Sequence, residues 1–203
     1  MELNEYQNRK MNTLSEISNG LVKKLDDCLD NNYCAGCKGC CCSNCPCGFS
    51  PKDFIDVNDL DYMKTLLNTG LLAISPLDFS NQTLYIRSRG IKDLDTIVTG
   101  LVCSNNSCLF STYKGCMLDP YLRPSEGLLL LPNMVSYDMQ LETCHQVYTD
   151  SLMKSDWYPY QKALKELKSY YKNREIEKPE ITDKVLEDYT YKLIGSKRKK
   201  GAK

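Results

Sequence analysis

The chain has 203 residues, of which 42% are hydrophobic and 12 are cysteines. This length suits a single domain, and the hydrophobic fraction is sufficient for a buried core. Lysine plus arginine and aspartate plus glutamate each number 26, so the formal net charge is zero. A neutral chain has no overall attraction for nucleic acid or for an anionic membrane, so we expect neither as a partner.

The polarity of the chain favours a cytoplasmic protein. Residues 1–10 are polar and charged and lack the apolar core of a signal peptide. The longest apolar run, residues 128–131, is far too short to span a membrane. The basic segment 196–203 is typical of a disordered, solvated tail. In a reducing cytosol, clustered cysteines are more often metal ligands than disulfide partners.

The first elements in chain order are a helix and a cysteine-rich loop. Leu14, Ile17 and Leu21 recur at helical spacing, which predicts an N-terminal helix over residues 1–30. Cys28 continues this apolar stripe and is expected to be a core residue. The loop that follows is rich in glycine as well as cysteine and is incompatible with regular helix or strand.

A second helix is predicted directly after this loop. Ser50 suits the N-cap position, Pro51 the first helical position and Asp53 the third. Apolar residues continue the helical face as far as Leu67, and Gly70 is the expected stop. The cysteine-rich loop would therefore lie between two helices.

Beyond residue 80 the pattern changes to that of a short sheet followed by helices. Residues 83–87 and 96–99 favour the two strands of a small β-hairpin. Helices are predicted at 137–154, 156–173 and 182–194. The expected fold is mainly α with a small β-hairpin, an α+β class in which irregular cysteine-rich metal-binding loops pack between helices.

The chain divides on this basis into four parts. These are an N-terminal helix (1–30), a cysteine cluster domain (31–150), a C-terminal helical extension (151–195) and the basic tail (196–203). The second part carries every cysteine except Cys28.

Seven of the cysteines fall within residues 34–47, and their spacing predicts a metal centre. Cys-x-x-Cys spacing lets a tight turn direct two thiolates at one metal. Zinc takes four such ligands, and a [4Fe–4S] cluster is also held by four thiolates. The soft donor set argues against magnesium, calcium and facial-triad iron, and leaves zinc, iron–sulfur and copper(I). The candidate ligands are Cys34, Cys37, Cys40, Cys41, Cys42, Cys45, Cys47, Cys103, Cys108, Cys116 and Cys144.

These motifs resemble the YkgJ-like family of CxxCxxCC cysteine cluster proteins, which are described as zinc- or iron-chelating. The resemblance covers roughly residues 30–150. Its elements follow the order expected for the family: the signature over residues 34–41, then Cys108, Gly115-Cys116, Tyr121-Leu122-Arg123-Pro124 and Cys144.

The resemblance implies a ligand set and a metal. Related flagellin lysine methylases are associated with a [4Fe–4S] cluster, which favours iron–sulfur over zinc. Arg123 is expected to be structural, donating hydrogen bonds to backbone carbonyls or a carboxylate. The family usually has a further cysteine where this chain has Gly127, and Cys42, Cys45 or Cys47 could replace it. The implied cofactor ligands are Cys34, Cys37, Cys40, Cys41, Cys108, Cys116 and Cys144.

Three functions fit these features. We expect a [4Fe–4S] cluster-binding protein with a redox or accessory role and a redox or modification-pathway protein as partner. The alternative is a zinc-binding protein with a structural or metal-chelating site. The third is a small cluster-dependent enzyme, which would use an open iron site or a spare thiolate such as Cys42, with His145 as a possible base.

Overall fold

A single hydrophobic core joins side chains from Tyr6 to Ile194. The structure, a computed structural model, describes residues 1–28, 45–80, 83–100, 105–112, 115–132 and 144–195. Helices of the predicted N-terminal, central and C-terminal parts all contribute to this core. The predicted basic tail lies outside the described residues.

The N-terminal helix α1 (Leu3–Ile17) is shorter than the helix predicted over residues 1–30. Asn19 and Gly20 both have positive φ, at 51° and 78°. The Gly20 amide bonds back to a carbonyl of the last helical turn at 2.7 Å, which is the Schellman ending of a helix. The chain continues as a separate 3-10 turn, η1 (Leu25–Asp27).

The helix predicted after the cysteine-rich loop is divided in two. Ser50 caps only a 3-10 turn, η2 (Pro51–Asp53), as its hydroxyl accepts a backbone N–H at 3.3 Å. The α-helix α4 (Leu60–Leu67) begins later, where the Asp59 carboxylate accepts two further backbone N–H groups. The predicted start of the α-helix at Ser50 is therefore wrong, because Ser50 caps a separate 3-10 turn and Asp59 caps the α-helix. Gly70, with a φ of 72°, follows the end of α4 as expected.

The largest hairpin pairs β1 (Leu72–Pro76) with β2 (Leu84–Ser88) in antiparallel register. The strand predicted at residues 83–87 is confirmed, but the strand predicted at 96–99 is wrong. That segment forms only an isolated bridge to β1. All residues of β1 are buried, so its sequence lacks the period-two alternation that identifies a strand with one exposed face.

Two smaller hairpins complete the strands of the described residues. β3 (Ser111–Thr112) pairs with β4 (Gly115–Cys116), and β5 (Leu130–Pro132) pairs with β6 (Cys144–Gln146). The helix predicted at 137–154 is wrong over residues 144–146, which form β6 and pair with β5. The mixed α+β class is confirmed.

The C-terminal part is helical, as predicted. The helix predicted at 156–173 is interrupted by Pro159 in a 3-10 turn, whereas the helix predicted at 182–194 is confirmed. The elements are α6 (Asp150–Trp157), η4 (Tyr158–Tyr160), α7 (Gln161–Tyr171) and α8 (Asp183–Leu193). In the described part of the chain, every helix is too short or too polar to cross a membrane.

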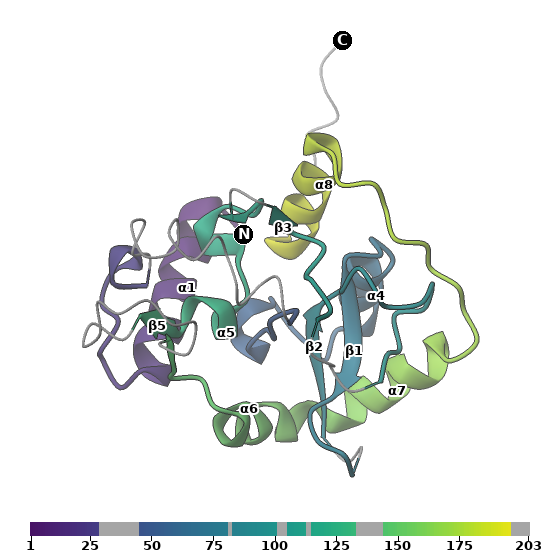
Figure 1. The fold of residues 1–203 in the computed structure, drawn as a ribbon, viewed down its shortest axis with the longest axis horizontal. Helices are drawn as coiled ribbons and strands as arrows, with labels where there is room; N and C mark the ends of the chain where they lie inside the picture. The colour runs from purple at the N-terminus through teal and green to yellow at the C-terminus, as the bar shows by residue number, and fades with distance from the viewer. Residues whose placement is uncertain (29–44, 81–82, 101–104, 113–114, 133–143, 196–203) are drawn as a thin grey trace.

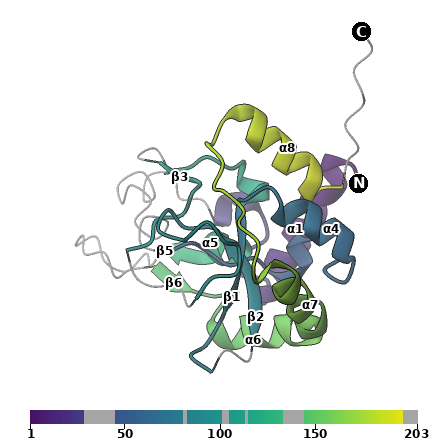
Figure 2. The same cartoon turned by 90° about the vertical axis from the view of Figure 1, so that its right-hand side faces the viewer.

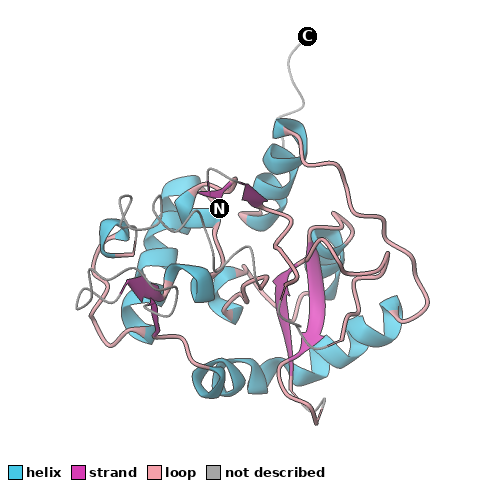
Figure 3. Ribbon diagram, viewed as in Figure 1, coloured by secondary structure: helices cyan, strands magenta, loops and turns pink. Residues whose placement is uncertain are grey.

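Helices α4, α6, α7 and α8 lie around the β1–β2 hairpin (Figures 1 and 3). α7 packs on β2, and α4 packs on β1, α7 and α8. α1, α5 (Ser125–Leu128) and β5 lie on the other side of the molecule (Figure 1). In the turned view, α8 lies at one end of the hairpin, and α6 and α7 lie at the other (Figure 2).

A buried ion pair attaches α1 to the segment that follows the cysteine-rich loop. Lys10 Nζ lies 2.7 Å from the Asp53 carboxylate, and both side chains are at most 1% exposed. Lys10 also donates to the Arg123 carbonyl at 2.6 Å and to the Ser125 hydroxyl at 3.1 Å. Asp53 accepts the Ser50 N–H, the Ser125 N–H and the Ser125 hydroxyl, at 2.7–3.1 Å. Both buried charges are therefore fully hydrogen-bonded, as burial of charge requires.

Replacing Lys10 with methionine should lower the free energy of unfolding by roughly 3–5 kcal/mol, because Asp53 would keep a buried charge without its partner. Urea denaturation at neutral pH measures this change. The matched control is Lys52→Met, which removes a solvent-exposed pair with Glu16 and should cost less than about 1 kcal/mol. Equal losses in the two variants would contradict the role assigned to Lys10.

Candidate metal centre

Two of the described candidate ligands, Cys47 and Cys108, lie at the end of β2. The Cys47 carbonyl accepts the Ser88 N–H at 3.0 Å, which aligns the segment of Cys45 and Cys47 antiparallel to β2. Cys108 stands opposite Gly90 in a second antiparallel bridge. The two segments are distant in sequence, yet Cys47 lies opposite Ser88, the last residue of β2, and Cys108 lies opposite Gly90, shortly after it.

Glu126 of α5 holds the backbone next to Cys47 in place. Its carboxylate accepts the N–H of Gly48 and the side-chain amide of Gln146, the latter at 3.3 Å. Burial raises the pKa of Glu126 to about 7, while the Gly48 N–H opposes that rise. Partial burial raises the pKa of the Cys45 thiol to about 11, and the neighbouring Glu126 charge adds to the effect. The sequence marks no role for Glu126, because its partners lie in two other segments.

The Cys47 side chain is 7% exposed and points at Gly127. A Cβ atom added to Gly127 would lie 3.2 Å from the Cys47 sulfur, closer than ordinary van der Waals contact. Gly127 is the position at which the resembled family usually has a further cysteine. The Cys47 side chain fills the space into which a side chain at this position would extend.

Cys108, which precedes β3, lies near Cys116 of β4. Cys108 is buried, which raises the pKa of its thiol to about 12, and nearby Cys116 contributes to the rise. The Ser88 hydroxyl lies beside this thiol and is fully buried. Among the described residues, the Ser88 oxygen has no partner at full hydrogen-bond geometry.

A second buried ion pair shapes the loop that carries Cys108. The Arg87 guanidinium binds Asp93 through two hydrogen bonds of 2.9 and 3.0 Å. Asp93 also accepts the Gly90 N–H at 2.7 Å and the Asn106 amide at 3.0 Å. Residues on both sides of the loop are therefore attached to one carboxylate, which brings Cys108 back to the end of β2.

The described thiols suit a soft metal but do not complete a site among themselves. In the part of the chain that the structure describes, no group of three or more Cys, His, Asp or Glu side chains is arranged to hold a metal ion. A four-thiolate centre built on either pair needs further ligands. The other candidates lie outside the described residues: Cys34, Cys37, Cys40, Cys41, Cys42 and Cys103.

The remaining sequence predictions concern β6, the Arg-Pro element and Cys28. The structure places Cys144 and His145 in β6, and His145 is exposed. Arg123 donates to the Leu118 carbonyl at 3.1 Å, which is the kind of backbone hydrogen bond predicted for it. Cys28 is 5% exposed and belongs to the hydrophobic core, as predicted.

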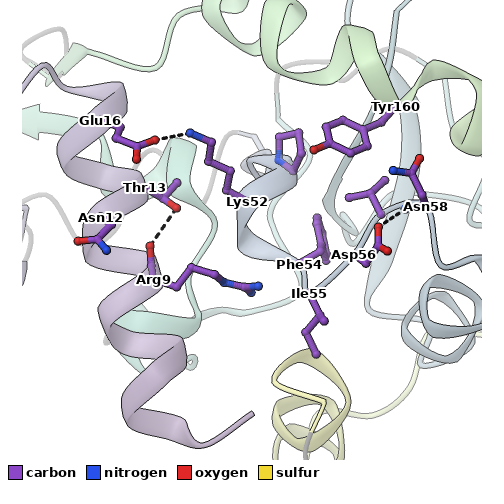
Figure 4. Close-up of a pocket in the computed structure, with 12 residues that line it drawn as sticks. Arg9, Asn12, Thr13, Glu16, Lys52, Phe54, Ile55, Asp56, Asn58 and Tyr160 are labelled. Atoms are coloured by element: carbon purple, nitrogen blue, oxygen red, sulfur yellow. Dashed lines mark hydrogen bonds and ion pairs between the residues drawn. The ribbon is translucent and has the colours of Figure 1, made fainter.

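A crevice of about 420 Å³ lies between α1 and the segment 51–58 (Figure 4). Its polar walls are largely bonded to each other: Lys52 pairs with Glu16, and the Thr13 hydroxyl donates to the Arg9 carbonyl at 3.0 Å. None of the described residues that line it is a cysteine. No described candidate ligand therefore borders this crevice.

A scan against protein-family models, a search of curated proteins and a search of solved structures each found no match. The resemblance to the YkgJ-like family thus remains a prediction from the motifs. Function has to be inferred from the donor set and from the positions of the described cysteines.

Replacing Asp93 with asparagine should lower the free energy of unfolding by roughly 3 kcal/mol near neutral pH, because Arg87 would lose its buried counter-charge. Burial disfavours the Asp93 carboxylate, but the bonds and charge of Arg87 outweigh burial and hold its pKa below the usual value. A lowered pKa in the folded state stabilises the fold above about pH 4 and loses that effect on further acidification.

The difference between wild type and Asp93→Asn should therefore be constant above about pH 5 and shrink below about pH 4. Urea unfolding of both proteins across this range measures it. A difference that widens on acidification would contradict the assigned pKa direction.

Proposed function

We propose that the chain binds a [4Fe–4S] cluster through cysteine thiolates and has a redox or accessory role beside a protein partner. One observation carries the proposal: Cys47 and Cys108, from distant segments, both neighbour Ser88. Soft thiol donors gathered from two segments suit a thiophilic metal. The dense Cys-x-x-Cys spacing of residues 34–47 supplies more thiols than one zinc ion requires.

The surroundings of these cysteines also suit a cluster. Reduction potentials of iron–sulfur clusters depend on hydrogen bonds to sulfur and on solvent exposure. Cys47 and Cys108 are buried, and the Ser88 hydroxyl stands beside Cys108 as a potential donor. When bound, the cluster would supply one-electron chemistry, and this chain would supply thiolates, burial and the hydroxyl donor.

Zinc is the second candidate, and Glu126 is the observation that favours it. Its carboxylate lies near Cys45, and zinc accepts carboxylate as well as thiolate ligands. Iron–sulfur clusters are held mainly by cysteine. The Glu126 carboxylate already bonds to Gly48 and Gln146, so this role would compete with its structural contacts.

Anaerobic purification followed by iron, zinc and sulfide analysis tests the proposal. We expect a coloured protein with broad visible absorption and about equal amounts of iron and acid-labile sulfide, as a [4Fe–4S] cluster requires. A colourless protein that contains zinc would overturn the cluster and establish the second candidate. A protein that binds neither metal, even after anaerobic incubation with ferrous iron and sulfide or with zinc, would overturn both.

Replacing Cys108 with serine should remove most of the bound metal, because the site would lose a thiolate that the fold has brought to it. The matched control is Cys28→Ser, since Cys28 is also buried but lies in the hydrophobic core. We expect Cys28→Ser to lower stability by about 1–3 kcal/mol without changing metal content. Equal metal content in wild type and Cys108→Ser would show that Cys108 is not a ligand.

A further inference from the structure

We propose that Cys47 is a ligand of the same centre as Cys108, and that residue 127 is a glycine because the Cys47 sulfur occupies the space in front of it. The ligand taken up is a thiophilic metal ion or an iron of a cluster. This inference rests on the proposed metal-binding function and assigns one specific thiolate to it.

Residue 127 is a glycine because there is no space for a side chain, and not because of its backbone conformation. The positive-φ glycines of the described residues are Gly20, Gly70, Gly115 and Gly195, and Gly127 is not one of them. Its backbone would therefore accept a side chain without strain. The obstacle is the Cys47 side chain, whose sulfur and Cβ would lie 3.2 and 3.5 Å from an added Cβ.

Contacts of the protein itself hold Cys47 in this position. On one side, the Gly48 N–H bonds to Glu126, the residue that precedes Gly127. On the other, the Cys47 carbonyl accepts the Ser88 N–H at 3.0 Å. The backbone of Cys47 is thus bound to α5 and to β2 at once, which directs its thiol before any metal binds.

Ser88 provides the independent observation that points to a bound group. Gly48 pairs with Arg87 in antiparallel register, so Cys47 stands opposite Ser88, and opposite residues share one face with Cβ atoms about 5 Å apart. The fully buried Ser88 hydroxyl also lies beside the Cys108 thiol. Its oxygen has no hydrogen-bond partner of full geometry among the described residues.

The contact of the buried Ser88 hydroxyl with the Cys108 thiol falls short of full hydrogen-bond geometry, and a metal-bound thiolate, which is a stronger acceptor, would take its proton in a hydrogen bond. Cys47 and Cys108 both adjoin Ser88, so a metal held by the two thiolates would satisfy this hydroxyl. Each thiol would release its proton to solvent as it binds the metal.

Moving the thiol from position 47 to position 127 tests the inference. The variants are Cys47→Ala, and Cys47→Ala combined with Gly127→Cys, which presents a sulfur from the opposite side of the same space. The control combines Cys47→Ala with Ala163→Cys, which restores the number of cysteines on α7, on the other side of the molecule from α5 (Figure 1). Bound iron, sulfide and zinc, visible absorption and thermal unfolding are measured on each protein after anaerobic purification.

We expect Cys47→Ala to bind metal at least about ten-fold more weakly, since loss of a supporting residue alone costs that much. The Gly127→Cys exchange should restore most of the metal, and the Ala163→Cys control should not. If wild type binds metal and Cys47→Ala retains all of it with unchanged absorption, this inference fails while the proposed function stands. If wild type binds no metal, the proposed function fails.

A further variant guards against loss of folding in Cys47→Ala. Gly127→Val keeps all the cysteines but fills the space of the Cys47 sulfur, and should also lower the bound metal. Its control is Gly100→Val, because an added Cβ at Gly100 would meet no atom of the described structure within 4 Å. Equal metal content in these two valine variants would overturn the inference even if Cys47→Ala does not fold.

Discussion

The buried pair of Lys10 and Asp53 is the interaction on which the arrangement of the described structure depends. It joins α1, the η2 turn and the chain at Ser125, three segments that share no local contact in sequence. Cys47 lies just before η2, and Gly127 lies just after Ser125. The same pair therefore sets how the end of the cysteine-rich loop faces α5, and hence where the Cys47 sulfur lies.

A charged pair provides something that apolar packing would not. A buried ion pair is often no more stabilising than well-packed apolar residues of the same volume. Its bonds, however, are directional: each Asp53 oxygen has its own donors, and Lys10 Nζ is aimed at three acceptors. Sliding of η2 against α5 by one residue would leave these groups unpaired. We infer that the pair selects one register for the two segments that meet at Cys47.

The sequence predicted the local elements around the Lys10–Asp53 pair but not the long-range contacts between them. The cap at Ser50, the strand β2 and the helix α8 follow from turn chemistry and periodicity, which are local. Asp53 was recognised only as a helix-start acid, because its partner Lys10 lies 43 positions earlier. β1 escaped prediction because both of its faces are buried. The cysteines could be named as candidates, but only the structure shows that Cys47, and not its exposed neighbour Cys45, faces Gly127.

Whether a bound metal would be structural or functional depends on how far the fold is held together without it. In zinc fingers the metal supplies most of the folding energy, because the chain has little core of its own. Here an extensive hydrophobic core and two bonded ion-pair networks hold the described fold, and none of the ion-pairing side chains is a candidate ligand. Hydrogen bonds to Glu126 and Ser88 direct Cys47 without a metal. A fold that positions Cys47 in advance has little need of a metal at that residue in order to form, which favours a centre used for chemistry over one used as a clamp.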